Sequence, residues 1–409
     1  MRSKWLVVFL LALGMVIAYV DRMNLSVVLA YRDFKDLFHL SDTDRGLLSS
    51  TFFWTYALLQ IPAGWVIDRY GAKRPYAIGF ALWSLASAAA GMVHGIGQLV
   101  ATRLILGVGE SVSTAASLRW IRFNCREDQR GLATGILFSG TKLGAAIGAP
   151  VTVFLIDRYD WRMMFVILGL GGLVWLVAWM GIVRDERPAA VTNTADTGVR
   201  IRDLLRSPAI WGIVLGTFAY NYFIYFCLTW LPAYFTEARH LSPQSMSLFT
   251  MFSFGGMAGV GILAGWVADR IIASGHNPIR VRKTFTLLGF VLASTEVVGM
   301  LAKSNEVALF FAIFSLAGLG LTTANYWALT QTIFPKSAIG RMVGIQNCAS
   351  NLSGIVAPIV TGWLIRTTGG YGAAGIAILV VLAIGVTSYG LLVRDDAGER
   401  LSALSVRAA

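Results

Sequence analysis

The chain has 409 residues, of which 56% are hydrophobic and 14% are charged. Soluble domains contain about 25% charged residues, so this composition excludes an ordinary soluble protein and favours a membrane protein. The net charge of +12 would suggest nucleic-acid binding in a soluble chain, but no basic and aromatic stretch lies outside the expected helix ends, and we exclude that partner.

Twelve unbroken apolar segments occupy most of the chain. A helix needs about 20 mostly apolar residues to cross a bilayer, whereas the strands of a β-barrel alternate in polarity over about 10 residues, so the segments predict helices. In chain order the expected spans are 5–30, 46–67, 76–93, 97–118, 130–156, 161–183, 208–235, 243–268, 284–302, 306–330, 340–366 and 371–393. Arg2 and Lys4 precede the first span as in a signal peptide, but no small-residue cleavage pattern follows, so we expect a retained helix.

The longest polar interruption falls between the sixth and seventh spans. It predicts an N-terminal six-helix bundle over 1–183, a cytoplasmic linker over 184–207, a C-terminal six-helix bundle over 208–393 and a cytoplasmic tail over 394–409. Most of the 34 Lys and Arg residues then lie on the side of the linker and the termini, which the positive-inside rule assigns to the cytoplasm. We therefore expect a multi-pass protein of the cell inner (cytoplasmic) membrane with both termini cytoplasmic.

Several ionisable side chains interrupt the expected spans. They are Asp21, Arg22, Arg103, Glu110, Lys142 and Glu296. A charge at the bilayer centre costs about 2.5–3.5 kcal/mol even on insertion scales, so these side chains must face a protein-lined cavity rather than lipid. This pattern predicts the movement of a charged solute or of protons across the membrane.

The two expected halves share sequence motifs. Gly-Trp-Val-Ile-Asp-Arg at 64–69 closes the second span, and Gly-Trp-Val-Ala-Asp-Arg at 265–270 closes the eighth. Ala-Pro at 149–150 in the fifth span is repeated at 357–358 in the eleventh. These repeats predict duplicated halves, and halves related by an axis along the membrane normal place the solute site between them near the midplane.

The loop after the second span resembles a known family motif. Gly64, Asp68, Arg69, Gly71, Lys73 and Arg74 match the loop between the second and third helices of the major facilitator superfamily. The resemblance covers essentially the whole chain and implies two pseudo-symmetric six-helix bundles, with these residues holding the cytoplasmic gate. Asp269 and Arg270 form a second copy, in which a longer insert weakens the expectation of gating. The alternative interpretation is an ordinary positive-inside turn.

Spacing restricts how the charges in the first and fourth spans can interact. Asp21 and Arg22 are adjacent and point about 100° apart on a helix, so each needs its own partner unless both reach water at a helix end. Arg103 and Glu110 lie two turns apart on one face, about 10.5 Å along the axis, which is too far for a direct bond. That separation suits a carboxylate-sized solute at one end and a proton at the other, or a pair of structural contacts with other helices.

The combination of these charges resembles the anion:cation symporter branch of the superfamily, which includes galactonate and hexuronate transporters and vesicular glutamate and sialic acid carriers. The resemblance implies that Arg22 and Arg103 face the solute carboxylate and that Asp21 and Glu110 carry protons. Arginine forks onto carboxylates, and a carboxylic acid in a low-dielectric site can cycle between its two states. The resemblance also gives a set of neutral pocket residues, each of which could equally serve packing: Tyr56, Tyr225, Trp327, Asn347 and Asn351.

Two charged residues lack a counterpart in this pattern. Lys142 in the fifth span occupies a position where relatives usually carry neutral residues. It either pairs with Glu110 or Asp21, or provides a third cationic contact for the solute, and we favour substrate binding. Glu296 in the ninth span is expected to be a partly wet structural carboxylate rather than a proton site.

The sequence as a whole predicts a proton-coupled symporter that imports a small organic anion, such as a sugar acid, by alternating access. Alternatives are an aromatic-carboxylate transporter or an exporter or antiporter, although drug pumps favour acidic pockets over intramembrane cations. The four His residues form no H-x-x-x-H pair, so we expect neither an enzyme nor a metal site nor a cofactor. The expected partners are the organic anion, protons and the lipid bilayer, and we expect a monomer.

Overall fold

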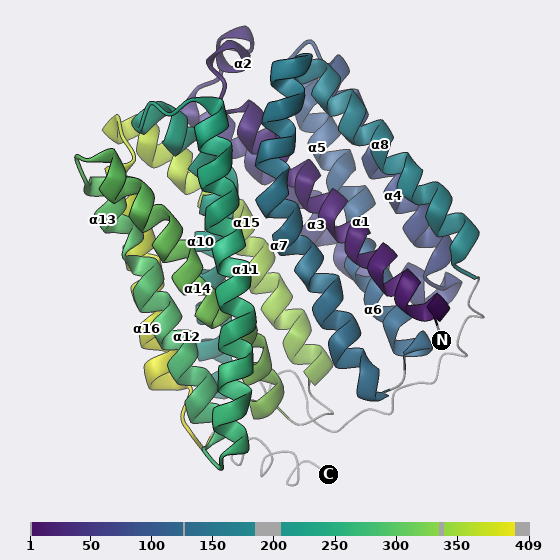
Figure 1. The fold of residues 1–409 in the computed structure, drawn as a ribbon, viewed down its shortest axis with the longest axis vertical. Coiled ribbons are helices and arrows are strands. Elements are labelled where there is room, and N and C mark those ends of the chain that lie inside the picture. The colour runs from purple at the N-terminus through teal and green to yellow at the C-terminus, as the bar shows by residue number, and fades with distance from the viewer. Residues whose placement is uncertain (1, 126, 185–205, 335–338, 397–409) are drawn as a thin grey trace. The chain divides into compact units, whose positions relative to one another are not determined.

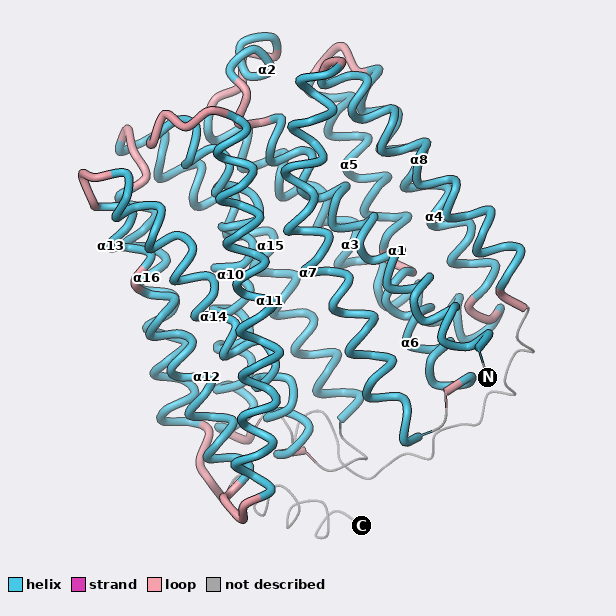
Figure 2. The backbone as a smooth tube through the Cα atoms, in the orientation of Figure 1, coloured by secondary structure: helices cyan, strands magenta, loops and turns pink. Residues whose placement is uncertain are grey.

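The computed structural model describes residues 2–125, 127–184, 206–334 and 339–396, and these residues form helices joined by short loops and turns (Figures 1 and 2). No strand occurs in these ranges, as the apolar segments predict. Residues 185–205 of the expected linker and 397–409 of the expected tail lie outside the described residues.

The first six spans correspond to single helices or to broken pairs of helices. They are α1 (Arg2–Val28), α3 (Asp42–Tyr70), α4 (Lys73–Ala89) with the 3₁₀ turn η1 (Ala90–Met92), α5 (Ile96–Glu110) with α6 (Ser113–Asn124), α7 (Glu127–Arg158) and α8 (Trp161–Ile182). The short helix α2 (Arg32–Leu37) lies between the first two spans. Local sequence fixes several starts: Ser41 and Asp44 form a capping box at α3, and Asp160 caps α8.

The last six spans follow the same plan. They are α10 (Pro208–Ala233) with the π-helical turn η2 (Tyr234–Ala238), α11 (Pro243–Ala273), α12 (Pro278–Ser294) with α13 (Glu296–Leu301), α14 (Asn305–Ile333), α15 (Ile339–Thr368) and α16 (Gly372–Leu392). Asn277 caps α12 directly before Pro278, and Ser304 caps α14. Of the spans in the described ranges, 10 are long and apolar enough to cross a membrane by length and composition. The 17-residue α4 and the more polar α3 complete the predicted twelve.

The chain divides into two compact units. Unit 1 comprises Met1–Thr192 and Leu228–Met251, and unit 2 comprises Asn193–Cys227 and Phe252–Ala409. Within unit 1, Glu237 of η2 forms ion pairs with Lys35 at 2.7 Å and with Arg45 at 3.0 Å. These pairs connect the segment Leu228–Met251 to α2 and α3.

Both units use the same helix pairings. In unit 1, α4 packs on α5 and α8, so the third span contacts the fourth and the sixth. In unit 2, α12 packs on α14 and α16, so the ninth span contacts the tenth and the twelfth. The internal repeat in the sequence therefore corresponds to a repeat in packing.

Helices α1 and α7 approach closely because α7 presents glycines to α1. A Cβ atom added at Gly144 would lie 2.5 Å from the Val16 carbonyl oxygen and 2.8 Å from the Tyr19 Cβ atom. A Cβ atom at Gly148 would lie 2.9 Å from the Met23 Cβ atom. Small residues at four-residue spacing permit such contact between helices. This seam positions the segment of α1 that carries the first two charged residues.

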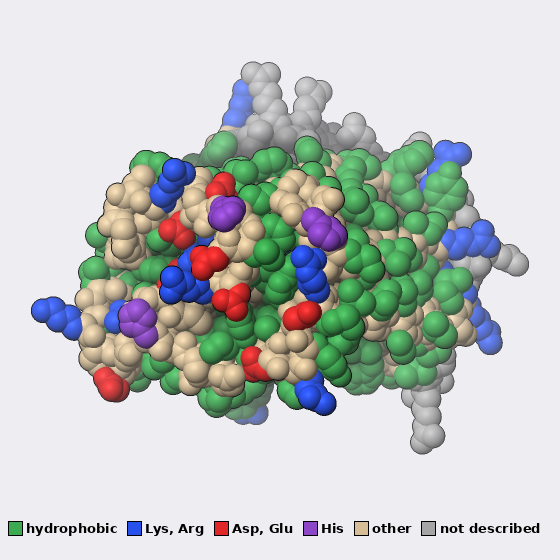
Figure 3. Space-filling model, turned by 90° about the horizontal axis from the view of Figure 1, so that it is seen from above, with side chains coloured by type: hydrophobic (Ala, Val, Ile, Leu, Met, Phe, Trp, Pro, Cys, Tyr) green, Lys and Arg blue, Asp and Glu red, His purple; other side chains and the backbone are tan. Residues whose placement is uncertain are grey.

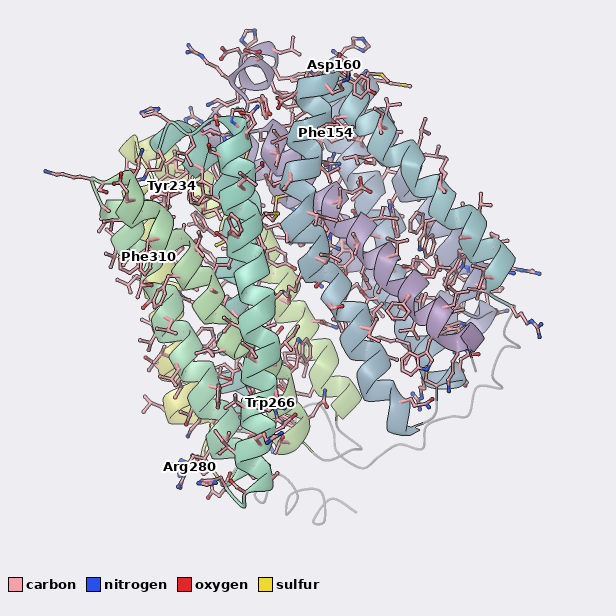
Figure 4. All side chains as sticks on the ribbon, in the orientation of Figure 1. Phe154, Asp160, Tyr234, Trp266, Arg280 and Phe310 are labelled. Atoms are coloured by element: carbon pink, nitrogen blue, oxygen red, sulfur yellow. The ribbon has the colours of Figure 1, made fainter. Side chains whose placement is uncertain are left out.

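Large apolar side chains cover the flanks of the helices. Phe154 of α7 is 66% exposed and Phe310 of α14 is 58% exposed, and both lie along the sides of their helices (Figure 4). In contrast, Lys, Arg, Asp, Glu and His side chains gather at the helix ends near α2 (Figure 3). An apolar flank with charged ends is the surface that a bilayer requires of a spanning helix.

Candidate functional site

Two predicted site residues from different helices form an ion pair inside unit 1. Arg22 of α1 donates to one oxygen of Glu110 at the end of α5, from Nη2 at 2.6 Å and from Nε at 2.9 Å. Both side chains are nearly fully buried. The cation that neutralises Glu110 is therefore on α1, a partner that the spacing within the fourth span could not indicate.

Asp21 lies beside this pair and has a different environment. Its Oδ1 atom accepts hydrogen bonds from Ser87 Oγ of α4 at 2.7 Å and from Asn24 Nδ2 at 3.3 Å. Its Oδ2 atom is buried and has no hydrogen-bond partner in the described part of the chain. Asp21 is thus held by neutral donors, whereas Glu110 is held by a cation.

Arg103 of α5 is only 2% exposed, yet most of its hydrogen-bonding capacity is unused. Its Nη1 atom donates to the Asp21 carbonyl oxygen at 3.3 Å, and its guanidinium lies 5.3 Å from the Phe165 ring centroid. Its Nε and Nη2 atoms are buried without an acceptor among the described residues. Buried donors without acceptors are costly, so this guanidinium is suited to an anionic ligand.

Aromatic rings surround the Arg22 guanidinium. The ring centroids of Tyr19, Phe52 and Tyr56 lie 4.7, 4.5 and 4.9 Å from it. Tyr56, a predicted pocket residue, is buried and stacks on Phe52 at 5.0 Å. Ring faces attract cations, so this cage fixes the position of the arginine next to Glu110.

A pocket opens beside the two arginines within unit 1. Its lining combines these cations with three hydroxyl side chains and five apolar ones: Arg22, Arg103, Ser26, Ser49, Thr229, Leu25, Phe52, Phe53, Leu106 and Leu228. The chemistry of this lining suits a small carboxylate with one polar end and one apolar side.

Two other predicted charges are placed differently from expectation. Lys142 of α7 is partly exposed and forms no ion pair or hydrogen bond with the described residues, so the alternative of a salt bridge to Glu110 or Asp21 is wrong. Glu296 is only 1% exposed and accepts a hydrogen bond from Ser315 Oγ at 2.5 Å. The expectation of a partly wet carboxylate there is also wrong, because the break between α12 and α13 turns the side chain towards α14.

The neutral residues predicted for the second half lie in unit 2. Tyr225 of α10 and Asn351 of α15 are buried, whereas Trp327 of α14 and Asn347 of α15 are partly exposed. The Trp327 ring lies 5.4 Å from that of Tyr326. Their predicted contact with a solute stays a prediction.

The two copies of the loop motif share one local geometry. Arg69 lies over the Trp65 ring at 5.5 Å, and Arg270 lies over the Trp266 ring at 4.6 Å near the end of α11 (Figure 4). Gly71 ends α3 with a φ of 81°, a backbone conformation that favours glycine.

The remaining predicted gate residues lie around these turns. Asp269 pairs with Arg282 at 2.8 Å. Gly64 and Arg74 belong to α3 and α4, and the side chain of Asp68 lies outside the described residues. Gating by the seven predicted residues stays a prediction.

Sequence reasoning missed the neutral partners of the charged cluster. Ser87 has no sequence feature that connects it to Asp21, whereas Asn24 follows Asp21 by three residues and thus shares its helix face. No group of three His, Cys, Asp or Glu that could hold a metal ion occurs in the part of the chain that the structure describes. The buried polar groups of the site are arginine donors and carboxylates, which suit an anion and protons better than a metal.

Comparison with known proteins matches the chain to membrane transporters. The family model described as Major Facilitator Superfamily matches residues 11–358. The chain is 29% identical to the hexuronate transporter of Bacillus subtilis (strain 168), with 94% of each chain covered. It is 30% identical to the D-galactonate transporter of Escherichia coli O6:H1, with 96% of each chain covered. The crystal structure of a D-xylose–proton symporter shares the fold with a TM-score of 0.76 at 16% identity, covering 95% of this chain and 97% of that one.

Proposed function

This chain belongs to the major facilitator superfamily, and we propose that it is a proton-coupled symporter that imports a small organic anion by alternating access. Members of this family and the curated relatives are transporters, so the chain is a multi-pass membrane transporter and not an enzyme.

The observation that carries the proposal is the unused hydrogen-bonding capacity of Arg103. Its buried Nε and Nη2 atoms lack acceptors among the described residues, and the residue lines the pocket beside Arg22. A carboxylate presents two oxygens that such a fork binds in a bidentate manner, and burial makes this bond stronger than it is in water. Hexuronates and D-galactonate, the solutes in the names of the two relatives, each carry one carboxylate, so we propose a sugar acid as the solute.

Proton coupling is proposed for Asp21 and Glu110. A buried carboxylate oxygen without a partner, such as Oδ2 of Asp21, costs free energy that proton uptake removes. Glu110 binds Arg22 when ionised, so a proton on Glu110 would release Arg22 for the solute. In this proposal, Asp21 is a proton site. Glu110 is a second proton site, and its protonation frees Arg22 to bind the solute.

An aromatic carboxylate is the second candidate solute. Phe52 and Phe53 line the cavity, and their rings could stack on an aromatic acid. This candidate and the sugar acid share the carboxylate contact with Arg103, so uptake assays with both classes separate them.

We also propose the orientation that the charges favour. Both termini and the gate loop that contains Arg69 and Arg74 would lie in the cytoplasm, in the inner membrane of the cell. A monomer is sufficient for this function because the proposed site is built from one chain.

The test is the variant Arg103→Lys in proteoliposomes, with uptake of radiolabelled D-galactonate and D-glucuronate measured with and without an inward proton gradient. A lysine cannot reproduce the fork, so we expect uptake to fall about tenfold or more, equivalent to about 1.4 kcal/mol or more of lost binding. The control is Arg162→Lys, because Arg162 donates to the backbone carbonyls of Gly91 and Val93 and does not line the pocket. Near-normal affinity in the Arg103 variant would refute the assignment.

A further inference from the structure

Two serines in the cavity differ from the other buried hydroxyl residues of their helices. Ser26 on α1 is 3% exposed and Ser49 on α3 is 8% exposed, and both line the cavity beside the arginines. No hydrogen bond of either hydroxyl occurs within the described part of the chain. Their side chains are therefore buried, polar and directed to a space that a ligand can occupy.

Neighbouring residues show the usual behaviour of hydroxyl groups in helices. Ser50 donates to the Leu47 carbonyl oxygen at 2.7 Å, and Thr51 donates to that of Leu48 at 2.7 Å. Such bonds to the preceding turn satisfy a hydroxyl without any ligand. Ser49, one residue earlier on the same helix, forms no such bond, although its own helix offers one.

The positions of the two serines relate them to the arginines. Ser26 follows Arg22 by four residues, so it lies on the same face of α1, about 6 Å farther along the axis. Ser49 precedes Phe52 and Phe53 by one turn on α3, and these rings line the same cavity. A carboxylate bound at Arg103 therefore places the next few carbon atoms of the solute near hydroxyl groups.

Apart from the hydroxyl of Thr229, the rest of the lining cannot satisfy a hydroxyl group of the solute. Leu25, Leu106, Leu228 and the two phenylalanines carry no polar side-chain atom. A buried hydroxyl of the solute would lose its hydrogen bonds to water against this surface, at a cost that only a polar side chain offsets. The serines thus provide the neutral hydrogen-bonding groups that the arginines do not.

We propose that Ser26 and Ser49 bind hydroxyl groups of the solute and select hydroxylated carboxylates over their deoxy counterparts. The proposal rests on the proposed function, because the carboxylate contact with Arg103 fixes the position of the solute relative to the two serines. A site built to hydrogen-bond a hydroxyl rejects an analogue without it, since the buried groups of the site are then left unpaired. In this proposal the arginines provide affinity for anions, and the serines provide selectivity among different anions.

The experiment measures inhibition of radiolabelled D-galactonate uptake by unlabelled D-galactonate, 3-deoxy-D-galactonate and hexanoate. We expect the protein to prefer D-galactonate to hexanoate by about tenfold or more. In Ser26→Ala and Ser49→Ala, affinity for D-galactonate should fall about three- to tenfold while affinity for hexanoate stays unchanged, so the preference collapses. Ser50→Ala is the matched control, because the Ser50 hydroxyl bonds to its own helix.

The outcomes separate this proposal from the proposed function. If the protein binds none of the carboxylates, the proposed function itself fails. If it binds D-galactonate and hexanoate equally, or if the alanine variants weaken both to the same degree, the serines do not read hydroxyl groups and the proposal is overturned. Melting temperatures check the folding of each variant, and Ser26→Cys and Ser49→Cys, which keep the volume but weaken the hydrogen bond, should show the same loss of preference.

Discussion

The bond between Arg22 and Glu110 gives one arginine two competing partners. The Nε and Nη2 atoms of Arg22 both donate to the Oε2 atom of Glu110. The Oε1 atom of Glu110 has no hydrogen-bond partner among the described residues. A solute carboxylate near Arg22 must therefore compete with an internal carboxylate. In the proposed mechanism, protonation of Glu110 weakens its bond to Arg22, and this would link proton binding to solute binding through one side chain.

Glu110→Gln tests this link because glutamine mimics the permanently protonated state. We expect the variant to lose accumulation of solute against a gradient and to keep binding and counterflow exchange, since Arg22 stays available to the solute. The measurement compares proton-driven uptake with exchange in proteoliposomes. Glu296→Gln is the control, a buried carboxylate of unit 2 bonded to Ser315. If Glu110→Gln still accumulates solute, the proton passes elsewhere, and Asp21 is the first candidate.

Lys142 supports a second prediction about the solute. Its ammonium forms no ion pair with the described residues, so its removal leaves no buried carboxylate unpaired there. We expect Lys142→Met and Lys142→Gln to weaken transport of dicarboxylates more than that of matched monocarboxylates, by about threefold or more. Parallel uptake assays with D-glucarate and D-gluconate measure this. Equal losses for both solutes together with a lower melting temperature would show that the residue is structural.

At the residue scale, the sequence pointed to four charges that the structure brings together, Asp21, Arg22, Arg103 and Glu110, but not to how they pair. Charges inside apolar spans are visible in the sequence because they are costly in lipid. The partner of Glu110 is not visible, because it lies 88 positions away on another helix. Ser26 and Ser49 were missed for a similar reason, since serine is common in membrane helices and only the missing bond to the preceding turn distinguishes them.

The seam between α1 and α7 determines where the charged segment of α1 lies. We expect Gly144→Ala to separate the helices, because its Cβ atom would lie 2.5 Å from the Val16 carbonyl oxygen. The melting temperature should fall by several degrees, equivalent to about 1–3 kcal/mol, and uptake should fall with it. Thermal unfolding in detergent and uptake in proteoliposomes measure the two effects.

Gly135 on the same helix is the matched control for this substitution. A Cβ atom added there meets nothing within 4 Å, so Gly135→Ala should leave stability unchanged or raise it by about 0.4–1 kcal/mol. A loss of stability in Gly135→Ala equal to that in Gly144→Ala would mean that the loss does not come from the close contact with the Val16 carbonyl oxygen.

Among the elements, the long spans could be predicted and the short irregular ones could not. The helix α2 was missed because only Phe34 and Phe38 carry its packing on Trp161, too few residues for a periodic pattern. The break between α5 and α6 directly after Glu110 also has no proline to mark it.

The four charges of the cluster sum to zero when both carboxylates are ionised, because Asp21 and Glu110 balance Arg22 and Arg103. A monovalent solute carboxylate then leaves the cluster with one excess negative charge, in a region where an uncompensated charge is costly. One proton per solute restores neutrality. In the proposed symport, this balance corresponds to one proton per monocarboxylate, so that the solute and its proton together carry no net charge.

We expect the pH difference alone, and not the membrane potential, to drive the uptake of a monocarboxylate. Proteoliposomes with a potassium gradient and valinomycin should show the same initial rate at zero and at inside-negative potential when the pH difference is fixed. A rate that rises with an inside-negative potential would require more than one proton per solute. An electroneutral cycle also ties the highest accumulation of solute to the size of the pH difference, so such a carrier would collect its solute most strongly from acidic surroundings.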